Sequence, residues 1–407
     1  MKILFLQKRI LFPANTGGRI RTLNIVRHLA RWHDITYLCN LQKGEEEYLP
    51  EMKKLGLRME TIPWSEVSRS SPLFYRDLAL NLVSQYPFNV NKDYHPVLRE
   101  RARELLASEP FDLLICDFVQ MARNAIGLPC RASVLFQHNV EAQIFERHAR
   151  TDRGFLRRKY MALQAAKMRR FEGTAGLEFD SVVAVSEQDR AMYERDYGWK
   201  HASVIDTAVD TDFFRPTGGQ ERPERVLFVG SLDWLPNEDG LKHFVDEIWP
   251  KIRARRPDAV FQVVGRNPTA AMLALGDAPG VEVVGTVPDT RPYLDGGAVV
   301  VVPLRIGGGT RIKIFEAMAM QKAIVSTTLG AEGLRVASGE HLLLADDPDS
   351  FSSAVVELLN NASKRQQLAK QARHLVETEF SAVTIARQFE RICLDTVEAK
   401  RRSLSPV

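Results

Sequence analysis

The feature that most constrains the fold is a regular alternation of short apolar runs with amphipathic stretches of helical period. The apolar runs show no alternation with polar residues, which is typical of parallel strands buried on both faces. Strands that alternate with helices predict a parallel sheet covered by helices. We therefore predict an α/β chain built on doubly wound sheets.

The alternation occurs as two series, and the second begins after residue 220. The first series predicts strands at 2–6, 35–39, 113–117, 133–137 and 181–186, and helices at 18–31, 97–108 and 140–172. The second predicts strands at 225–229, 259–264, 281–284, 298–302 and 323–327, and helices at 238–255, 310–320, 349–359, 364–377 and 382–400. Residues 41–95 show weak periodicity and contain four prolines, so they stay unassigned.

Two series in a chain of 407 residues indicate two Rossmann-like domains, because one hydrophobic core seldom organises so long a chain. Pro216 and the pair Gly218-Gly219 mark a linker between them. We predict an N-terminal domain at 1–205, a linker at 206–220, a second domain at 221–380, and a terminal helical segment at 381–407 that crosses back to the N-terminal domain.

Composition excludes several other classes of protein. With 45% hydrophobic and 26% charged residues the chain is an ordinary globular one. The four cysteines lie far apart without a CxxC pair, which argues against a disulfide scaffold or zinc ribbon and favours a reducing compartment. No segment reaches the roughly 18–20 apolar residues of a membrane span, and the apolar start is too short for a signal peptide. We expect a cytoplasmic protein.

The formal charge of +4 is too small for a protein that coats nucleic acid, but its distribution is uneven. Residues 1–205 carry +7 and residues 206–407 carry −3. Much of the excess lies at 147–170, where nine Lys/Arg accompany one acid and apolar residues are interleaved. One interpretation is a helix packed on the sheet with a solvated face. The other is a surface for anionic lipid on the inner face of the plasma membrane, to which each basic residue adds about 1 kcal/mol.

A glycine-rich loop after the predicted strand 298–302 has the strongest chemical signal. Gly307, Gly308 and Gly309 lead into a helix, whose free amides and dipole attract anions. Arg311 and Lys313 fall in the first turn, where cations are unfavourable unless an anion is bound. The alternative is a glycine turn that caps a helix with solvated charges.

Several motifs in order make the chain similar to a known family. Glu316-Ala-Met-Ala matches the second glutamate of a pair spaced eight positions apart, and further similarity lies at 204–216, 323–334 and 341–348. The run 225–377 resembles the donor-binding half of the retaining glycosyltransferases of family 4, bacterial enzymes of glycan synthesis. The resemblance implies the GT-B fold, in which two doubly wound Rossmann-like domains face a central cleft.

The resemblance also implies a function. A sugar would pass from a GDP- or UDP-sugar to a hydroxyl of a glycan or lipid-linked acceptor, without metal or other cofactor, in cell-envelope or exopolysaccharide synthesis. Arg311 and Lys313 would stabilise the departing diphosphate, Glu316 would accept hydrogen bonds from the ribose diol, and His138 would face the donor sugar. Further donor-site candidates are Gly17, Gly18, Gly230, Ser231, Asn237, Gly265, Arg266, Val287, Arg305, Gly308, Gly309 and Thr310, and acceptor-side candidates are Arg21, Asp117 and Glu141.

Two departures from the family pattern bear on the chemistry. The first glutamate of the pair falls at Gly308, so that carboxylate is missing. The segment 228–237 lacks the Arg and Lys that the family places after the first strand of its second domain. We hypothesise that Arg305, Arg311 and Lys313 supply this charge from the opposite loop.

Other interpretations of the same residues stay open. His138 and Glu141 form an HxxE, but no further cluster accompanies them, so a metal site is not expected. A single histidine is often a structural residue. The alternatives to transfer are a nucleotide-sugar epimerase of the GT-B fold and a non-catalytic partner subunit that binds a nucleotide sugar.

Overall fold

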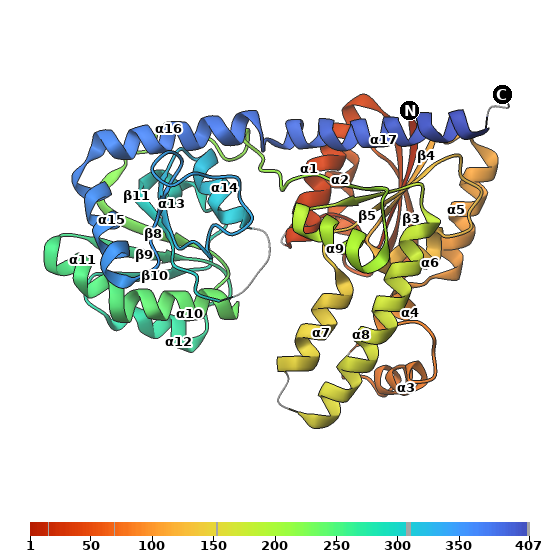
Figure 1. Cartoon of the computed structure of the whole chain (residues 1–407), viewed down its shortest axis with the longest axis horizontal. Helices are drawn as coiled ribbons and strands as arrows, with labels where there is room; N and C mark the ends of the chain where they lie inside the picture. The colour runs from red at the N-terminus through yellow and green to blue at the C-terminus, as the bar shows by residue number, and fades with distance from the viewer. Residues whose placement is uncertain (15, 69, 152–153, 307–310, 405–407) are drawn as a thin grey trace. The chain divides into compact units, whose positions relative to one another are not determined.

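The computed structural model describes residues 1–14, 16–68, 70–151, 154–306 and 311–404. The chain forms two compact units (Figure 1). The N-terminal unit comprises Met1–Asp206 and Ile385–Val407, and the C-terminal unit comprises Thr207–Thr384. Each unit contains one parallel sheet with helices on both faces, so the fold is α/β with two Rossmann-like domains.

The sheet of the N-terminal unit has the order β3-β2-β1-β4-β5-β6-β7 in the described residues. Its strands are β1 (Lys2–Gln7), β2 (Asp34–Gln42), β3 (Arg58–Trp64), β4 (Leu113–Asp117), β5 (Ser133–Phe136), β6 (Ser181–Ala184) and β7 (Ala202–Val204). The direction of winding reverses between β1 and β4. This reversal is a topological switch point, the place where ligands bind in doubly wound sheets.

The helices around this sheet are α1 (Gly17–Trp32), α2 (Leu49–Lys53), α3 (Pro72–Asn81), α4 (Phe88–Asp93), α5 (Pro96–Ser108), α6 (Ala122–Ala125), α7 (Glu141–Thr151), α8 (Phe155–Ala175), α9 (Glu187–Tyr197) and most of α17 (Ala382–Leu404). The unassigned stretch 41–95 therefore supplies an edge strand and three helices. The single helix predicted at 140–172 is wrong, because the structure has two helices, α7 and α8, that pack on each other.

The sheet of the C-terminal unit has the order β10-β9-β8-β11-β12-β13. Its strands are β8 (Arg222–Val229), β9 (Val260–Val264), β10 (Val281–Gly285), β11 (Gly297–Val302), β12 (Ala323–Ser326) and β13 (Leu343–Leu344). Its helices are α10 (Leu235–His243), α11 (Trp249–Arg255), α12 (Ala270–Leu273), α13 (Arg291–Gly296), α14 (Ile312–Ala319), α15 (Pro348–Asn360) and α16 (Ala362–Thr378). The switch point lies between β8 and β11.

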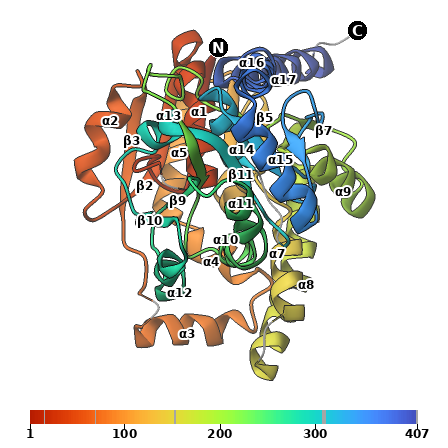
Figure 2. The same cartoon turned by 90° about the vertical axis from the view of Figure 1, so that its left-hand side faces the viewer.

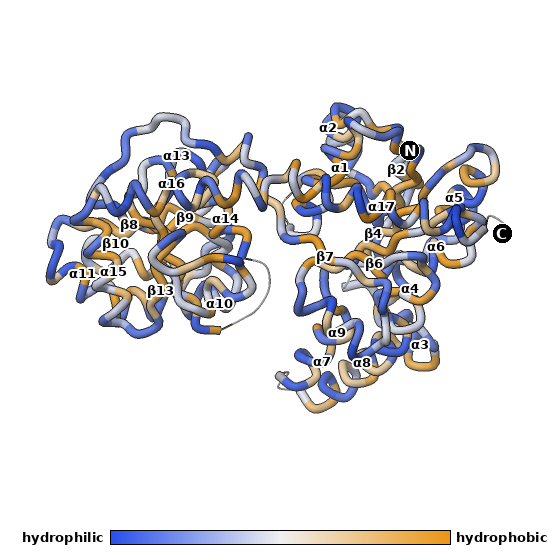
Figure 3. Tube along the Cα trace, turned by 45° about the horizontal axis from the view of Figure 1, so that its top comes forward, coloured by the Kyte–Doolittle hydropathy of each residue, from blue (hydrophilic) through white to orange (hydrophobic). Residues whose placement is uncertain are grey.

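The core explains why the strands read as continuous apolar runs. Val226 and Phe228 of β8 pack into one hydrophobic cluster, whereas Leu227 between them packs into another. Since successive side chains of a strand point to opposite faces, both faces of this sheet are buried. Figure 3 shows the hydrophobic colour concentrated along the strands of each unit.

The division between the units differs in detail from the predicted boundaries. The stretch predicted as a linker, 206–220, belongs to the C-terminal unit from Thr207 onward. Residues from Ile385 onward belong to the N-terminal unit, where the Phe389 and Phe136 rings lie 5.0 Å apart and Lys400 pairs with Asp180 at 2.7 Å. Within the described ranges, no helix combines the length and apolar character needed to cross a membrane.

Candidate functional site

The side chain of Lys313 lies at the switch point of the C-terminal sheet. Lys313 is in the first turn of α14, which follows β11, and its ammonium reaches the loop that follows β8. Its Nζ donates to Asn237 Oδ1 at 2.6 Å and lies 4.5 Å from the centre of the Phe228 ring. Asn237 Nδ2 in turn donates to the Ser231 carbonyl at 2.7 Å. The ammonium is therefore held where an anionic ligand of this sheet would bind.

The pKa values of Lys313 and of the neighbouring Glu316 are both shifted toward neutral pH. Burial, together with the smaller effect of the nearby Arg311 charge, lowers the pKa of Lys313 to about 7. Burial raises the pKa of Glu316, one turn along α14, to about 7, while Lys313 opposes that rise. Both groups therefore titrate near neutral pH, and an anion placed beside Lys313 would favour its charged form.

The other two predicted cations point elsewhere. Arg305 makes a two-pronged ion pair with Asp239, with N–O distances of 2.8 and 3.1 Å. Arg311 is buried, and its Nη2 donates to the Leu329 carbonyl at 3.0 Å. We hypothesised that Arg305, Arg311 and Lys313 supply the charge that is missing from the segment 228–237. Lys313 contacts Asn237 of that segment, whereas Arg305 contacts Asp239 and Arg311 contacts Leu329. The role of all three cations in binding a diphosphate stays a prediction. Gly308, Gly309 and Thr310 lie outside the described residues.

Gly265 has a packing role that the sequence did not reveal. A Cβ atom at this position would lie 1.6 Å from the Gly230 carbonyl oxygen, since the ends of β8 and β9 are in direct contact there. The Gly230 amide donates to the Val264 carbonyl at 3.0 Å. The lack of a side chain at Gly265, which we predicted as a donor-site residue, therefore makes room for the end of the neighbouring strand.

The loops around Gly265 are also tied to each other. Arg266 Nε donates to Ser231 Oγ at 3.1 Å, and Ser231 Oγ donates to Asp233 at 2.6 Å. Val287, in the loop after β10, is partly buried against the core. These contacts give the rim of the site a fixed shape.

We expect Gly265→Ala to lower the free energy of unfolding by about 2–3 kcal/mol, because the new methyl group overlaps backbone that cannot move aside. Urea denaturation of the full chain measures the change. Gly276→Ala is the matched control, since its Cβ would meet only Val283 Cγ2, at 3.8 Å. Equal stability of the two variants would contradict the packing role.

In the N-terminal unit a buried network surrounds Asp117, at the end of β4. His138 Nε2 lies 2.6 Å from Asp117 Oδ1, and Thr22 Oγ1 donates to Asp117 Oδ2 at 2.7 Å. Gln7, at the end of β1, also donates to Oδ2. This network joins the ends of β1, β4 and β5 at the second switch point.

The contacts of His138 define its protonation state. Nε2 donates to Asp117, so Nδ1 accepts from Arg21 Nη1 at 3.2 Å. Burial lowers the pKa of His138, and the Asp117 charge only partly opposes this. The side chain is 1% exposed. Both ring nitrogens of His138 thus have partners within the unit, and its hydrogen bond to the donor sugar stays a prediction.

Phe118 covers this network. Its ring stacks on the His138 ring with a centroid distance of 4.0 Å and an angle of 12°. Its φ of 73° is in the left-handed region, which costs a phenylalanine on the order of 1–3 kcal/mol. A Cβ at Gly18 would lie 3.0 Å from this ring, so the glycine of α1 makes room for it. Strain of this kind typically accompanies a binding site.

The remaining acceptor-side candidates lie in or around the same region. Burial lowers the pKa of Arg21 to about 10 and raises that of Glu141 to about 7. Glu141 begins α7, and its amide donates at 2.9 Å to Glu172, a buried carboxylate of α8 that sequence analysis missed. Gly17 is the first residue of α1.

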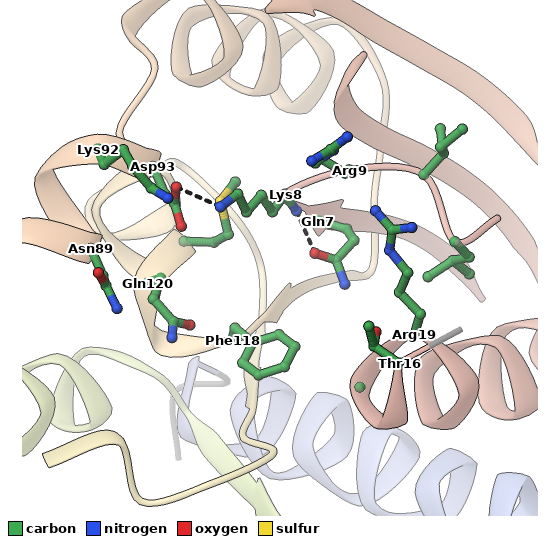
Figure 4. Close-up of a pocket in the computed structure, with 14 residues that line it drawn as sticks. Gln7, Lys8, Arg9, Thr16, Arg19, Asn89, Lys92, Asp93, Phe118 and Gln120 are labelled. Carbon is green, nitrogen blue, oxygen red and sulfur yellow. Dashed lines mark hydrogen bonds and ion pairs between the residues drawn. The ribbon is translucent and has the colours of Figure 1, made fainter. Parts of the chain in front are cut away.

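Beside Phe118 the structure contains a pocket of about 520 Å³ (Figure 4). It lies between the ends of β1 and β4 and the helices α1 and α4, and Gly18 and Phe118 are in its wall. Its charged wall residues were not predicted, although Lys8-Arg9 directly follows the first strand and was a usable signal. The charged residues of the wall are Lys8, Arg9, Arg19, Lys92 and Asp93. Over the described residues, no cluster of three or more His, Cys, Asp or Glu side chains is arranged to hold a metal ion.

Comparison with known families gives each half of the chain a match. Residues 16–213 match the model described as "Glycosyltransferase Family 4", and residues 223–361 match the model described as "Glycosyl transferases group 1". A curated relative from Klebsiella pneumoniae, described as an uncharacterized 44.6 kDa protein in the cps region, is 20% identical over 94% of this chain and 97% of its own length.

Solved structures share the fold. HepE from Anabaena, solved in complex with UDP, superimposes with a TM-score of 0.66 at 13% identity, over 97% of this chain and 100% of HepE. Sucrose-phosphate synthase from Thermosynechococcus elongatus superimposes with a TM-score of 0.65 at 17% identity, over 98% and 100% of the two chains. These structures have two Rossmann-like domains of the GT-B type.

Proposed function

We propose that this chain, a glycosyltransferase of the GT-B type, moves a sugar with retention of anomeric configuration from a UDP- or GDP-sugar to a hydroxyl group. The observation that carries the proposal is the Lys313 ammonium at the switch point of the C-terminal sheet, held by Asn237 and Phe228. A cation in this position is suited to the diphosphate of a nucleotide sugar.

In the proposed reaction the bond between the sugar C1 and the diphosphate oxygen breaks, and the electron pair leaves with the diphosphate. Lys313 stabilises the negative charge that develops there. The acceptor oxygen bonds to C1 on the same face, and its proton passes to the departing phosphate. Glu316 is proposed to accept hydrogen bonds from the ribose diol. The backbone amides of Gly309 and Thr310 and the charge of Arg311 are proposed to stabilise the negative charge of the diphosphate together with Lys313. No metal ion is required in this scheme.

The test uses the full chain with UDP- and GDP-sugars. We expect one nucleotide class to raise the melting temperature, and we expect NMR of the glycoside product to show the same anomeric configuration as the donor, with activity that persists in EDTA. An inverted product would overturn retention. A new epimer of the donor in the absence of acceptor would identify an epimerase, and nucleotide binding without transfer across an acceptor panel would identify a non-catalytic subunit.

The proposed pathway is polysaccharide synthesis. The relative from the Klebsiella cps region supports it, since this chain covers nearly the whole of that protein. The complex of HepE with UDP supports a uridine nucleotide as the first donor to test.

We also propose that the N-terminal unit docks on an anionic membrane through residues 147–170 and α3, from the cytoplasmic side. Phe155 and Leu156, at the start of α8, are 61% and 82% exposed beside Arg157 and Arg158. Lys167 Nζ donates to the Asn81 carbonyl at 2.6 Å, which fastens α3 to α8. Figure 2 shows α3 and α8 extending from the same side of this unit. Further exposed apolar residues there are Leu73, Tyr75, Leu80, Leu82 and Val83.

We expect the full chain to float with vesicles that contain anionic lipid at low salt, and the double variant Phe155→Ser/Leu156→Ser to reduce the bound fraction at least about tenfold. Burial of one such side chain contributes about 1.5–3 kcal/mol. Leu177→Ser, in the short turn that follows α8, is the matched control because Leu177 is also exposed. Absence of flotation by the wild-type chain would remove the membrane proposal.

A further inference from the structure

The pocket beside Phe118 is not used by the donor chemistry proposed above. It lies at the switch point of the N-terminal sheet, where ligands of such sheets bind. A transferase needs a second site for its acceptor, so the inference that follows rests on the proposed function. The chemistry of the wall residues then indicates which class of acceptor fits.

Positive charge exceeds negative charge around the pocket. Four cations and one carboxylate are in its wall. Among the described residues, two other carboxylates pair with these cations, Glu45 and Glu66, and both lie outside the wall. Glu66 contacts Lys92 and also lies 4.0 Å from Lys8 and 3.7 Å from Arg9. Four cations are therefore paired with three carboxylates, and the wall residues alone carry more positive than negative charge.

The excess is clearest at Arg9 and Arg19. Both guanidinium groups approach the same carboxylate, with Glu45 Oε1 at 2.7 Å from Arg9 Nη2 and at 3.5 Å from Arg19 Nη2. Burial lowers the pKa of Arg19, and the charge of Arg9 lowers it further. The other carboxylate near Arg9, Glu66, lies 3.7 Å away and is shared with Lys8 and Lys92, so an added anion at this position would be stabilised by both guanidinium groups.

The opposite side of the pocket carries hydrogen-bonding groups for a hydroxylated ligand. Figure 4 shows Asn89 and Asp93 on the side away from Arg9 and Arg19. Gln120 donates to Glu141, whereas its Oε1 is buried and accepts no hydrogen bond from the described residues. A ligand hydroxyl would satisfy this oxygen. Phe118 adds an apolar surface of the kind on which a sugar ring packs.

We propose that this pocket binds the acceptor, and that the acceptor is a sugar or polyol bearing an anionic group, a carboxylate or a phosphate. The anionic group lies between Arg9 and Arg19. The hydroxylated part lies toward Asn89, Asp93 and Gln120, with its ring against Phe118.

The test measures binding to the full chain by calorimetry, without donor. The probes are gluco, galacto and manno hexoses, each compared with its uronate and its 6-phosphate, together with inorganic phosphate. We expect at least one uronate or sugar phosphate to bind about tenfold or more tightly than its neutral hexose, and to weaken as salt is added. The uronate and phosphate arms distinguish the two anionic groups.

Arg19→Gln is expected to reduce binding of the anionic probe about tenfold, whereas the neutral hexose is unaffected. Lys54→Gln, an exposed lysine of the same unit outside the pocket, is the control. Arg9→Gln serves as the second variant if Arg19→Gln is unstable. The proposal is overturned if no anionic probe exceeds its neutral partner, or if inorganic phosphate binds as tightly as every sugar anion. Nucleotide binding, measured in parallel, reports separately on the proposed function.

Discussion

Replacing Lys313 with alanine is expected to lower kcat/KM for sugar transfer about 10²–10³-fold, which is the effect of removing one preorganised charge donor from a leaving group. The ammonium reaches the loop after β8 and is held there by Asn237 Oδ1 at 2.6 Å. Because burial already lowers the pKa of Lys313 to about 7, its removal relieves a desolvation cost, and the melting temperature should change little.

The same variant tests the charge of the site. A lysine with a pKa of about 7 is protonated below that pH, and a bound diphosphate raises its pKa. Binding of the nucleotide should therefore take up a proton, and affinity should fall between pH 7 and 9, by at most about tenfold per pH unit. Calorimetry in buffers of different ionisation enthalpy measures the uptake. We expect Lys313→Ala to abolish it.

Lys242→Ala is the control for this prediction. Lys242 is a solvent-exposed lysine of the same unit, paired with Asp246 at 2.9 Å. It should retain wild-type turnover and proton uptake. If Lys313→Ala turns over donor as fast as this control, Lys313 does not contact the diphosphate and the assignment of the site is incorrect.

The second large effect is expected at Asp117, whose replacement with alanine should lower the free energy of unfolding by about 3–5 kcal/mol. Asp117 is fully buried and accepts from His138, Thr22 and Gln7. Alanine would leave all three donors without this acceptor in a site that water does not reach. Urea denaturation, followed by signals from the N-terminal unit, measures the loss.

Asp77→Ala is the matched control, since Asp77 lies on helix α3, is solvent-exposed and pairs with its neighbour Arg76. Its effect should stay within about 0.5 kcal/mol. Nucleotide binding provides a second readout, because the Lys313 site belongs to the other unit. Asp117→Ala should keep nucleotide affinity at temperatures where it is folded. A stability equal to that of the Asp77 control would refute the role of the network.

The sequence predicted most of the sheet strands because buried parallel strands are continuous apolar runs, a signal contained in a few neighbouring residues. Strand β3 (Arg58–Trp64) was missed since, at the sheet edge, its side chains are mostly only partly buried and its run is not apolar. Strand β7 was missed because three residues are too short for any period. Strand β13, with two residues, has no period either, and only the family resemblance at 341–348 indicated it.

Some residues of the candidate sites could be named from local patterns in the sequence, and others could not. Lys313 and Asp117 were named as candidates because they lie at the start of a predicted helix and at the end of a predicted strand, and Glu316 because it lies in that helix and matches a family motif. The burial of His138 was not predicted, since it depends on Arg21, Phe118 and Asp117, which come from separate elements. The pairing of Arg305 with Asp239 also joins residues 66 positions apart.

The sequence by itself determined that the chain contains two parallel sheets and which loops follow their strands, because strand and helix periods are local properties. Only the tertiary structure decided which side chains in those loops meet. It brought Lys313 to the loop after β8, turned Arg305 and Arg311 away from it, and placed Arg9 and Arg19 on one carboxylate. The physical reason is that charge pairing and desolvation depend on distances between elements, and the winding of the sheet sets those distances.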